Sequence, residues 1–290
     1  MKIETISANY RSYIEEYLTK WMATFNDEPQ QRLYEAMSYS LLGGGKRIRP
    51  ILTLEFCRLC CGNYEKAAPF AAAIEMIQTY SLIHDDLPAM DNDDYRRGKL
   101  TNHKVYGEGI AILAGDALLT DAFACAASAD LPGDKVAFAI SVLANNTGSL
   151  GMVGGQVLDI MSEQRQLTEQ EVLDIQTRKT GALINASCAL GVIAGGGTQE
   201  QLQAACSFAG LLGLAFQIRD DMLDVIGTQE EMGKGVGTDE TKNTFVRLYG
   251  LEKCEELVQK YTDQAIDCLK VFEDTDYLVG LANYLTGRTV

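Results

Sequence analysis

Helical periodicity runs through almost all of the 290-residue chain and restricts it to a mostly helical fold. The chain contains only 5 prolines, and few prolines favour long helices because each one removes a backbone donor. No stretch shows the convincing period of two that is typical of a strand. The sequence therefore predicts an all-α bundle of about ten or more helices. Apolar residues recur at helical spacing over positions 10–25, 31–42, 51–61, 135–161, 169–190 and 201–226.

Breakers separate the helical stretches without dividing the chain. They lie at 43–50, Pro88, 131–134, 194–197 and 233–238. Thr168 followed by Glu171 has the spacing of a capping box and predicts a helix start there. Helices at 67–84 and 202–219 are apolar on most faces, as expected for the middle of a bundle. No long linker interrupts the sequence, so we expect a single domain over residues 1–290.

Composition excludes several classes of function. A net charge of −15 argues against nucleic acid or an anionic membrane as a partner, and favours divalent cations. Eight cysteines without zinc-site spacing, with only two histidines, predict reduced, buried thiols in a cytoplasmic protein. The N-terminal stretch lacks the apolar core of a signal peptide. The most apolar run, 67–83, is interrupted by Glu75 and Gln78, so we expect a core helix and no stable membrane association.

Two aspartate clusters are the features that point to chemistry. Residues 85–97 read DDLPAMDNDDYRR, and the second cluster, in QIRDDMLDVIG, has the form DDxxD. Each cluster follows a very apolar helix and precedes a breaker, so its carboxylates lie near a helix C-terminus, where negative charge is disfavoured. Divalent cations would reverse that cost. Oxygen ligands without histidine or thiolate suit Mg²⁺, which takes one or two carboxylates together with substrate phosphates.

Basic residues accompany the aspartates. Arg96 and Arg97 follow the first cluster directly, and the glycine-rich GGGKRIRP supplies further cations at a turn where the backbone can approach a phosphate. Arginine binds phosphate oxygens in a bidentate manner, whereas lysine acts as a point charge. Together the clusters predict a polyphosphate site, although each basic residue alone, Arg47 above all, could be an ordinary surface charge. The candidates are Lys46, Arg47, Arg49, Arg96, Arg97, Lys179, Lys234 and Lys242.

Over nearly its whole length the sequence resembles the trans-type, head-to-tail isoprenyl diphosphate synthases. Among these it is most similar to the bacterial farnesyl diphosphate synthases, or geranyltranstransferases. The resemblance rests on five motifs in the expected order: GGGKRIRP, SLIHDDLPAMDNDDYRRGKLTNHKVYGEGIAILAGDALL, GGQVLDI, RKTGALI and FQIRDDMLDVIG. It implies an isoprenoid synthase fold with central helices around an apolar cavity, and a homodimer. It also implies isopentenyl and allylic diphosphates as substrates.

The resemblance also implies a role for each matching residue. The aspartates would hold up to three Mg²⁺ ions on the allylic diphosphate, and these are Asp85, Asp86, Asp91, Asp220, Asp221 and Asp224. The allylic diphosphate would be contacted by Arg96, Lys179, Lys234 and Lys242. The isopentenyl diphosphate would be held by Lys46, Arg49, Gln78 and Arg97. Thr180 and Gln217, with Lys179, would face the reacting carbons, and Gln156 and Asp159 would line the same cavity.

Two departures from the family pattern matter. The family usually has a histidine seven residues before the first aspartate, where this chain has Gln78, which can donate a hydrogen bond but carries no charge. The segment between Asp239 and Lys242 is shorter than usual, which leaves the role of Lys242 open.

Product length should depend on the floor of the apolar pocket. Tyr80 precedes Asp85 by five residues, about 7.5 Å along a helix, and Ser81 lies one turn below Asp85. A bulky residue at Tyr80, with the inserted Pro88 and Ala89, resembles the arrangement that stops at fifteen carbons. The sequence thus predicts farnesyl diphosphate synthesis. Core packing by Tyr80, a geranylgeranyl diphosphate synthase, and a non-catalytic regulatory subunit remain alternatives. A terpene cyclase would lack GGGKRIRP, and an acidic ion buffer would need no basic cluster.

Overall fold

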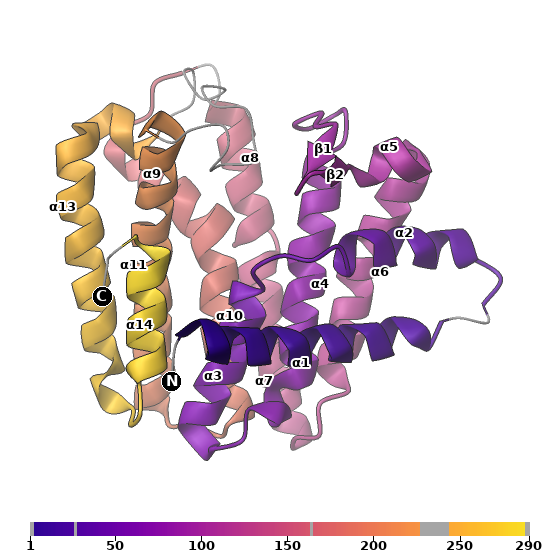
Figure 1. Ribbon diagram of the computed structural model, residues 1–290, viewed down its shortest axis with the longest axis horizontal. Coiled ribbons are helices and arrows are strands. Elements are labelled where there is room, and N and C mark those ends of the chain that lie inside the picture. The colour runs from indigo at the N-terminus through magenta and orange to yellow at the C-terminus, as the bar shows by residue number, and fades with distance from the viewer. Residues whose placement is uncertain (1–2, 26–27, 163–164, 227–243, 288–290) are drawn as a thin grey trace.

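The computed structural model describes residues 3–25, 28–162, 165–226 and 244–287 (Figure 1). The α-helices of these parts are α1 (Ile3–Ala23), α2 (Gln31–Leu41), α3 (Ile48–Cys61), α4 (Ala68–Asp85), α5 (Asn102–Tyr106), α6 (Glu108–Ala127), α7 (Gly133–Thr147), α8 (Met152–Ser162), α9 (Glu169–Gln176), α10 (Ala182–Ala194), α11 (Gln199–Ile226), α13 (Phe245–Cys268) and α14 (Asp276–Leu285). Two 3₁₀ turns, η1 (Tyr64–Ala67) and η3 (Leu269–Val271), and a π-helical turn, η2 (Thr177–Gly181), complete the helical part. The prediction of an all-α fold is confirmed.

Helices α4 and α10 form the centre of the bundle because nearly all of their faces are apolar. Helix α10 is buried from Leu183 to Ala194 except at Asn185 and packs against α3, α11, α7 and α4. Helix α4 packs most extensively against α6, and α1 crosses the front of the bundle (Figure 1). The end of α4 and the segment that follows it lie at the upper edge in this view. The predicted core helix at 67–84 thus ends where the first aspartate cluster begins.

A second, smaller hydrophobic cluster joins α13 to the C-terminal half of α11. It contains Ile218 and Met222 of α11 together with Phe245, Cys254 and Val258 of α13. The N-terminal half of α11 belongs to the main core through Phe208 and Leu212. One long helix therefore connects both clusters and carries the second aspartate cluster at its far end.

Some boundaries differ from the sequence expectations. The predicted helix over 135–161 is two helices, α7 and α8, because Gly148 takes an extended conformation and the chain turns before Met152. A two-stranded antiparallel hairpin, β1 (Tyr95–Arg96) and β2 (Lys99–Leu100), follows the first aspartate cluster. Strands of two residues are too short to show a period of two, so no periodic pattern predicts them.

The structure also differs from the expectations in the exposure of one thiol and in the number of long apolar helices. All eight cysteines are free, but Cys61 is exposed, so the prediction of uniformly buried thiols is wrong at that position. Three helical stretches of the described chain have the length and composition to cross a membrane: 108–127, 133–162 and 199–226. In each stretch, between 28% and 39% of an apolar window of 18 residues is buried within the bundle.

The capping box at α9 is present and gives a stability prediction. The Thr168 hydroxyl accepts from the Glu171 amide, and the Glu171 carboxylate accepts from the Thr168 amide. Thr168→Ala leaves that end of the helix without its cap and should lower the free energy of unfolding by about 1 kcal/mol in urea titrations. Thr120→Ala, which removes an exposed hydroxyl from the middle of α6, is the control and should cost much less. Equal losses in the two variants would contradict the capping interpretation.

Candidate active site

The first aspartate cluster lies where α4 ends. Asp85 is the last residue of α4, and Asp86 is the C-cap. The Asp91 amide donates to the Asp85 carbonyl oxygen at 2.8 Å, so the segment folds back on the helix end. Asp86 is buried and Asp85 half-buried, whereas Asp91 is exposed. The structure therefore gathers the three predicted metal ligands at one helix end.

Burial sets the electrostatic state of Asp85. Desolvation raises the pKa of this carboxyl to about 6, and the nearby Asp91 adds to the rise. The Lys179 ammonium opposes it, as does a hydrogen bond that the Gln156 amide donates to Asp85. A buried carboxylate with a raised pKa lacks positive charge, which is the condition that a bound cation relieves.

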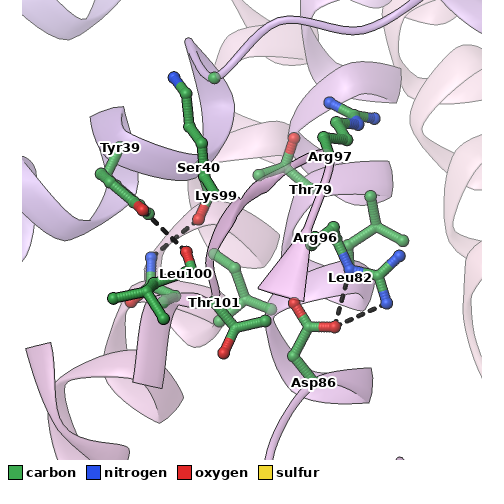
Figure 2. Close-up of a pocket in the computed structure, with 13 residues that line it drawn as sticks. Tyr39, Ser40, Thr79, Leu82, Asp86, Arg96, Arg97, Lys99, Leu100 and Thr101 are labelled. Carbon is green, nitrogen blue, oxygen red and sulfur yellow. Dashed lines mark hydrogen bonds and ion pairs between the residues drawn. The ribbon is translucent and has the colours of Figure 1, made fainter. Parts of the chain in front are cut away.

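Asp86 is paired with Arg96 of β1. The Arg96 Nη2 atom lies 2.6 Å from Asp86 Oδ1, and Nε donates to the same oxygen at 2.7 Å. Burial raises the pKa of Asp86, and Arg96 limits that rise. Figure 2 shows Arg96 bent toward Asp86 while Arg97 extends away from it. The hairpin β1–β2, which the sequence did not predict, thus directs the two neighbouring arginines away from each other.

The glycine-rich turn approaches Arg97. The Arg97 guanidinium donates to the Gly44 carbonyl oxygen. Gly45 has a φ of 132°, which strains any residue with a Cβ atom, and such an atom would also lie 2.8 Å from an Arg97 nitrogen, so this position favours glycine. Lys46 is exposed beside the turn. Three of the predicted phosphate contacts, Lys46, Arg49 and Arg97, therefore lie on this turn, directly after it or against it.

Arg49 has a buried Nε atom without a hydrogen-bond partner. Burial lowers the pKa of its guanidinium, and the carboxylates of Glu75 and Asp220 act in the opposite direction. The influence of Asp220 connects this arginine with the second aspartate cluster. A buried donor without a partner, near enough to the second cluster for Asp220 to act on it, is suited to an anionic ligand.

Helix α8 carries the GQxxD motif against the π-helical turn η2. Gly155 packs so closely that an added Cβ would meet the Lys179 backbone. Asp159 accepts from the Lys179 ammonium at 2.6 Å, and Gln156 reaches Asp85. A π-turn widens the helix locally and is frequent at functional sites. The predicted residues Gln156, Asp159 and Lys179 thus meet beside Asp85.

The second cluster lies near the end of α11. The Thr180 hydroxyl donates to Gln217 Oε1 at 3.4 Å, and Gln217 Nε2 donates to Asp221 Oδ1 at 3.0 Å. The Phe245 amide donates to the other Asp221 oxygen at 2.8 Å. Asp221 is buried, whereas Asp220 and Asp224 are half-buried. Asp221 is therefore fixed by α13, and its two neighbours are more accessible.

Two sets of side-chain hydrogen bonds, connected through the backbone of η2, link the two clusters. In the first set Gln156 of α8 donates to Asp85, and Asp159, three residues later on α8, accepts from Lys179 of η2. In the second set Thr180 of η2 donates to Gln217, which donates to Asp221. The clusters are about 130 residues apart in sequence, yet both are linked to this one turn. Lys234 and Lys242 lie outside the described residues.

Residues further down α4 complete the predicted set. Gln78, Ser81 and Asp85 share one helix face, and the Ser81 hydroxyl donates to the Gln78 carbonyl oxygen. Tyr80 is 6% exposed, and its ring lies edge-on to His84 at a centroid distance of 5.7 Å. Burial raises the pKa of Tyr80 to about 12, and Asp85 contributes, so the phenol lies near that carboxylate.

Sequence reasoning missed the importance of one pair. Arg47, a phosphate-site candidate for which an ordinary surface charge was the alternative, is 3% exposed and pairs with Glu75 of α4, which is 4% exposed. The only signal in the sequence is that Glu75 interrupts an otherwise apolar run.

The donor chemistry fits Mg²⁺. Asp85, Asp86, Asp220, Asp221 and Asp224 offer hard oxygen ligands, with neither imidazole nor thiolate among them. Among the described residues no three His, Cys, Asp or Glu side chains are arranged to hold an ion by themselves. Mg²⁺ retains waters and takes part of its ligands from substrate phosphates, so such a site does not require a complete set of protein ligands.

Comparisons with known proteins define the family. The polyprenyl synthetase family model matches residues 30–278. A farnesyl diphosphate synthase of Micrococcus luteus is 47% identical over 262 residues, covering 89% of this chain and 90% of that protein. The large subunit 1 of a heterodimeric geranylgeranyl pyrophosphate synthase of Arabidopsis thaliana is 47% identical over 268 residues, covering 89% and 72%. The crystal structure of a FPP/GFPP synthase of Zymomonas mobilis superposes with a TM-score of 0.88 at 36% identity, covering 98% of both chains.

The fold and site thus define a prenyltransferase with the all-α isoprenoid synthase fold. The chain belongs to the polyprenyl synthetase family. The resemblance inferred from the motifs is confirmed. Relatives with farnesyl and with geranylgeranyl products are similarly identical to this chain, so overall identity does not distinguish the product length.

The raised pKa of Asp85 gives a prediction with opposite effects on stability and activity. Protonated Asp85 favours the folded state below about pH 4, and this contribution is lost as the pH rises through about 6. Asparagine stays neutral, so Asp85→Asn should raise the free energy of unfolding of the ligand-free protein at pH 7.5 by on the order of 1–3 kcal/mol. The gain should be smaller at pH 5, whereas prenyl transfer should fall by more than about 100-fold.

Denaturant unfolding at the two pH values measures the effect. Asp130→Asn, an exposed aspartate outside the site, is the control and should change neither quantity. A destabilised Asp85→Asn protein at pH 7.5 would show that burial of this carboxylate carries no cost.

Proposed function

We propose that the protein condenses isopentenyl diphosphate with dimethylallyl diphosphate and then with geranyl diphosphate, forming farnesyl diphosphate. The observation that carries the proposal is the two sets of hydrogen bonds that link Asp85 and Asp221, at two acidic helix ends, to the one turn η2. Acidic helix ends with arginines beside them match a diphosphate that arrives with divalent cations.

The chain's own residues divide the two diphosphates between them. Arg96 and Lys179 flank the first aspartate cluster and would take the allylic diphosphate. Lys46, Arg49, Gln78 and Arg97 would hold the diphosphate of isopentenyl diphosphate. The unsatisfied Arg49 Nε supports this assignment. Bound Mg²⁺, held by Asp85, Asp86, Asp91 and Asp220, Asp221, Asp224, would supply Lewis-acid stabilisation of the leaving diphosphate.

The reaction needs no protein nucleophile. The allylic C–O bond breaks, its electron pair leaves with the diphosphate, and the double bond of isopentenyl diphosphate attacks the allylic carbon. A proton then leaves the adjacent carbon, for which the departed diphosphate is the nearest base. The oxygens of Thr180 and Gln217, 3.4 Å apart, would stabilise positive charge as dipoles. The apolar helices would exclude water that quenches the cation.

Tyr80 is proposed as the floor of the pocket. It is buried beneath Asp85, and its phenol is close enough to that carboxylate for its pKa to respond. A chain growing down α4 from the reacting carbons would therefore meet the ring after about one and a half helical turns. Ser81, which is smaller and half-buried, follows Tyr80 in sequence and lies on the face of α4 that also carries Asp85.

Removing the side chain that closes the pocket should deepen the pocket and lengthen the product. Tyr80→Ala removes the ring, so the growing chain should extend past fifteen carbons to twenty or more, within the polyprenyl series. The measurement is incubation with labelled isopentenyl diphosphate, each allylic starter and Mg²⁺, followed by chromatography of the hydrolysed products.

Tyr277→Ala is the matched control, because Tyr277 is also 6% exposed but lies on α14. It should destabilise the fold without lengthening the product. Products from Tyr80→Ala no longer than those of the wild type would show that Tyr80 is core packing only.

The same assay tests the alternatives. A wild-type product of twenty carbons would identify a geranylgeranyl diphosphate synthase. No product from the protein alone would favour a non-catalytic regulatory subunit, which two complete aspartate clusters argue against.

We propose further that the 290 residues form one domain and that two copies associate. The sharing of α11 between both hydrophobic clusters supports one domain. Exposed apolar side chains on three neighbouring elements support association, and they are Ile112 and Leu113 of α6, Phe138 of α7, Leu150, and Val153 and Val157 of α8. We also propose a cytoplasmic location without stable membrane association, since two of the three long apolar stretches carry polar groups of the site, Gln156 and Asp159 on α8 and the second aspartate cluster on α11.

Association can be measured by light scattering. The particle mass should be about twice the chain mass of 31.7 kDa. Phe138→Glu, which charges the 47%-exposed ring position, should shift the protein toward the monomer. The control is Lys135→Glu, an exposed position on α7, the helix that also carries Phe138. A wild-type monomer would contradict the proposal.

A further inference from the structure

Glu75 is a carboxylate buried in the middle of the apolar helix α4. It is 4% exposed, and its Oε1 atom pairs with Arg47 Nη1. Burying such a pair stabilises a protein little, because the cost of desolvating both ions offsets their attraction. A hydrophobic residue would fill this position more simply. The pair therefore requires an explanation other than stability.

Arg47 ties the glycine-rich turn to three helices at once. Its Nη1 atom pairs with Glu75 of α4, and Nη2 donates to the carbonyl oxygen of Leu41 in α2 at 2.8 Å. Its Nε atom lies 3.5 Å from Glu15 of α1. All these contacts are made by one guanidinium whose side chain has no exposed surface.

The backbone at Arg47 is held in an uncommon conformation. Its φ is +53° and its ψ is +31°, in the left-handed region, directly before the first residue of α3. Non-glycine residues occupy this region at a cost and remain there only when their surroundings fix them. The Glu75 contact is part of what fixes it. Arg47 joins the glycine-rich segment to α3. Its backbone conformation therefore sets the directions of Lys46, which precedes it, and of Arg49, which follows it in the first turn of the helix.

Glu75 also acts on the other cations of the site through its charge. Its carboxylate raises the pKa of Arg49 and of Arg97, both of which burial lowers. Arg47 contacts this buried carboxylate, and Arg49 and Arg97 lie near enough for its charge to act on them. Without this carboxylate the three guanidinium groups would repel each other.

We propose that Glu75 is a positioning residue for isopentenyl diphosphate, which acts through Arg47 to hold Lys46 and Arg49 in place and keeps Arg97 beside them. This inference rests on the proposed role of the glycine-rich turn. Glu75 lies ten residues, about 15 Å, before Asp85 along α4. Among the described residues its carboxylate pairs with Arg47 and with none of Asp85, Asp86 and Asp91. Its loss should therefore affect the two substrates unequally.

The test is the effect of Glu75→Gln on each substrate separately. The KM for isopentenyl diphosphate should rise at least tenfold, while the KM for geranyl diphosphate should change less than twofold. Glu75→Asp, which retains the charge on a shorter side chain, should recover part of the loss. Arg47→Lys retains charge but loses the fork, so it should reproduce the Glu75→Gln effect. Calorimetric titration of isopentenyl diphosphate should show the same tenfold weakening without turnover.

Glu55→Gln is the matched control for a purely structural effect. Glu55 is a fully buried carboxylate on α3 that accepts from Tyr10 and from Arg58 at 2.9 Å. Its loss should lower the melting temperature but leave the ratio of the two KM values unchanged.

The outcomes are distinguishable. If Glu75→Gln raises both KM values equally, or neither, the positioning role is wrong, and if Glu75→Gln does not fold, Glu75→Asp and Arg47→Lys decide by the same ratio. A wild-type protein that binds isopentenyl diphosphate but makes no product refutes the proposed function and leaves the calorimetric test valid.

Discussion

The structure depends on placing carboxylates at the ends of apolar helices, where negative charge is costly without a compensating cation. The site places cations of the chain itself beside these carboxylates. Arg96 pairs with Asp86, and Lys179 pairs with Asp159 beside Asp85. A diphosphate that arrives with divalent cations supplies both signs of charge. It can therefore replace these internal pairs by new ones, with the carboxylates turning to metal and the basic side chains to phosphate.

The helices make such an exchange possible because they fix where each group begins. Asp85 ends α4, Gln156 and Asp159 are on α8, and Lys179 and Thr180 are on the π-turn before α10. Groups on rigid elements hold their geometry more accurately than groups on loops. The glycine-rich turn is the exception, and Arg47 attaches it to α1, α2 and α4. The buried pair with Glu75 thus helps to fix the position of this loop relative to the helices.

Charge and apolar shape have separate tasks in this family. Relatives named for farnesyl and for geranylgeranyl products are about equally identical to this chain. In our proposal the charged residues of the motifs govern which bond is made. The length of the product then depends on which side chain closes the apolar pocket, and one side chain such as Tyr80 alters overall identity very little.

The sequence by itself determined the helical class, the central position of α4 and the two aspartate clusters at the ends of apolar helices, because helical periodicity and motif spacing are local properties. It also located the cap at Thr168. Only the tertiary structure showed the break at Gly148 and the hairpin at Tyr95–Leu100, because neither has a periodic pattern in the sequence, and the burial of Arg47, because that depends on a partner distant in sequence. Arg47 looks like any surface arginine until α4 brings Glu75 against it. Pairing across the bundle, which no local pattern encodes, turned a charge in a glycine-rich stretch into a fixed part of the site.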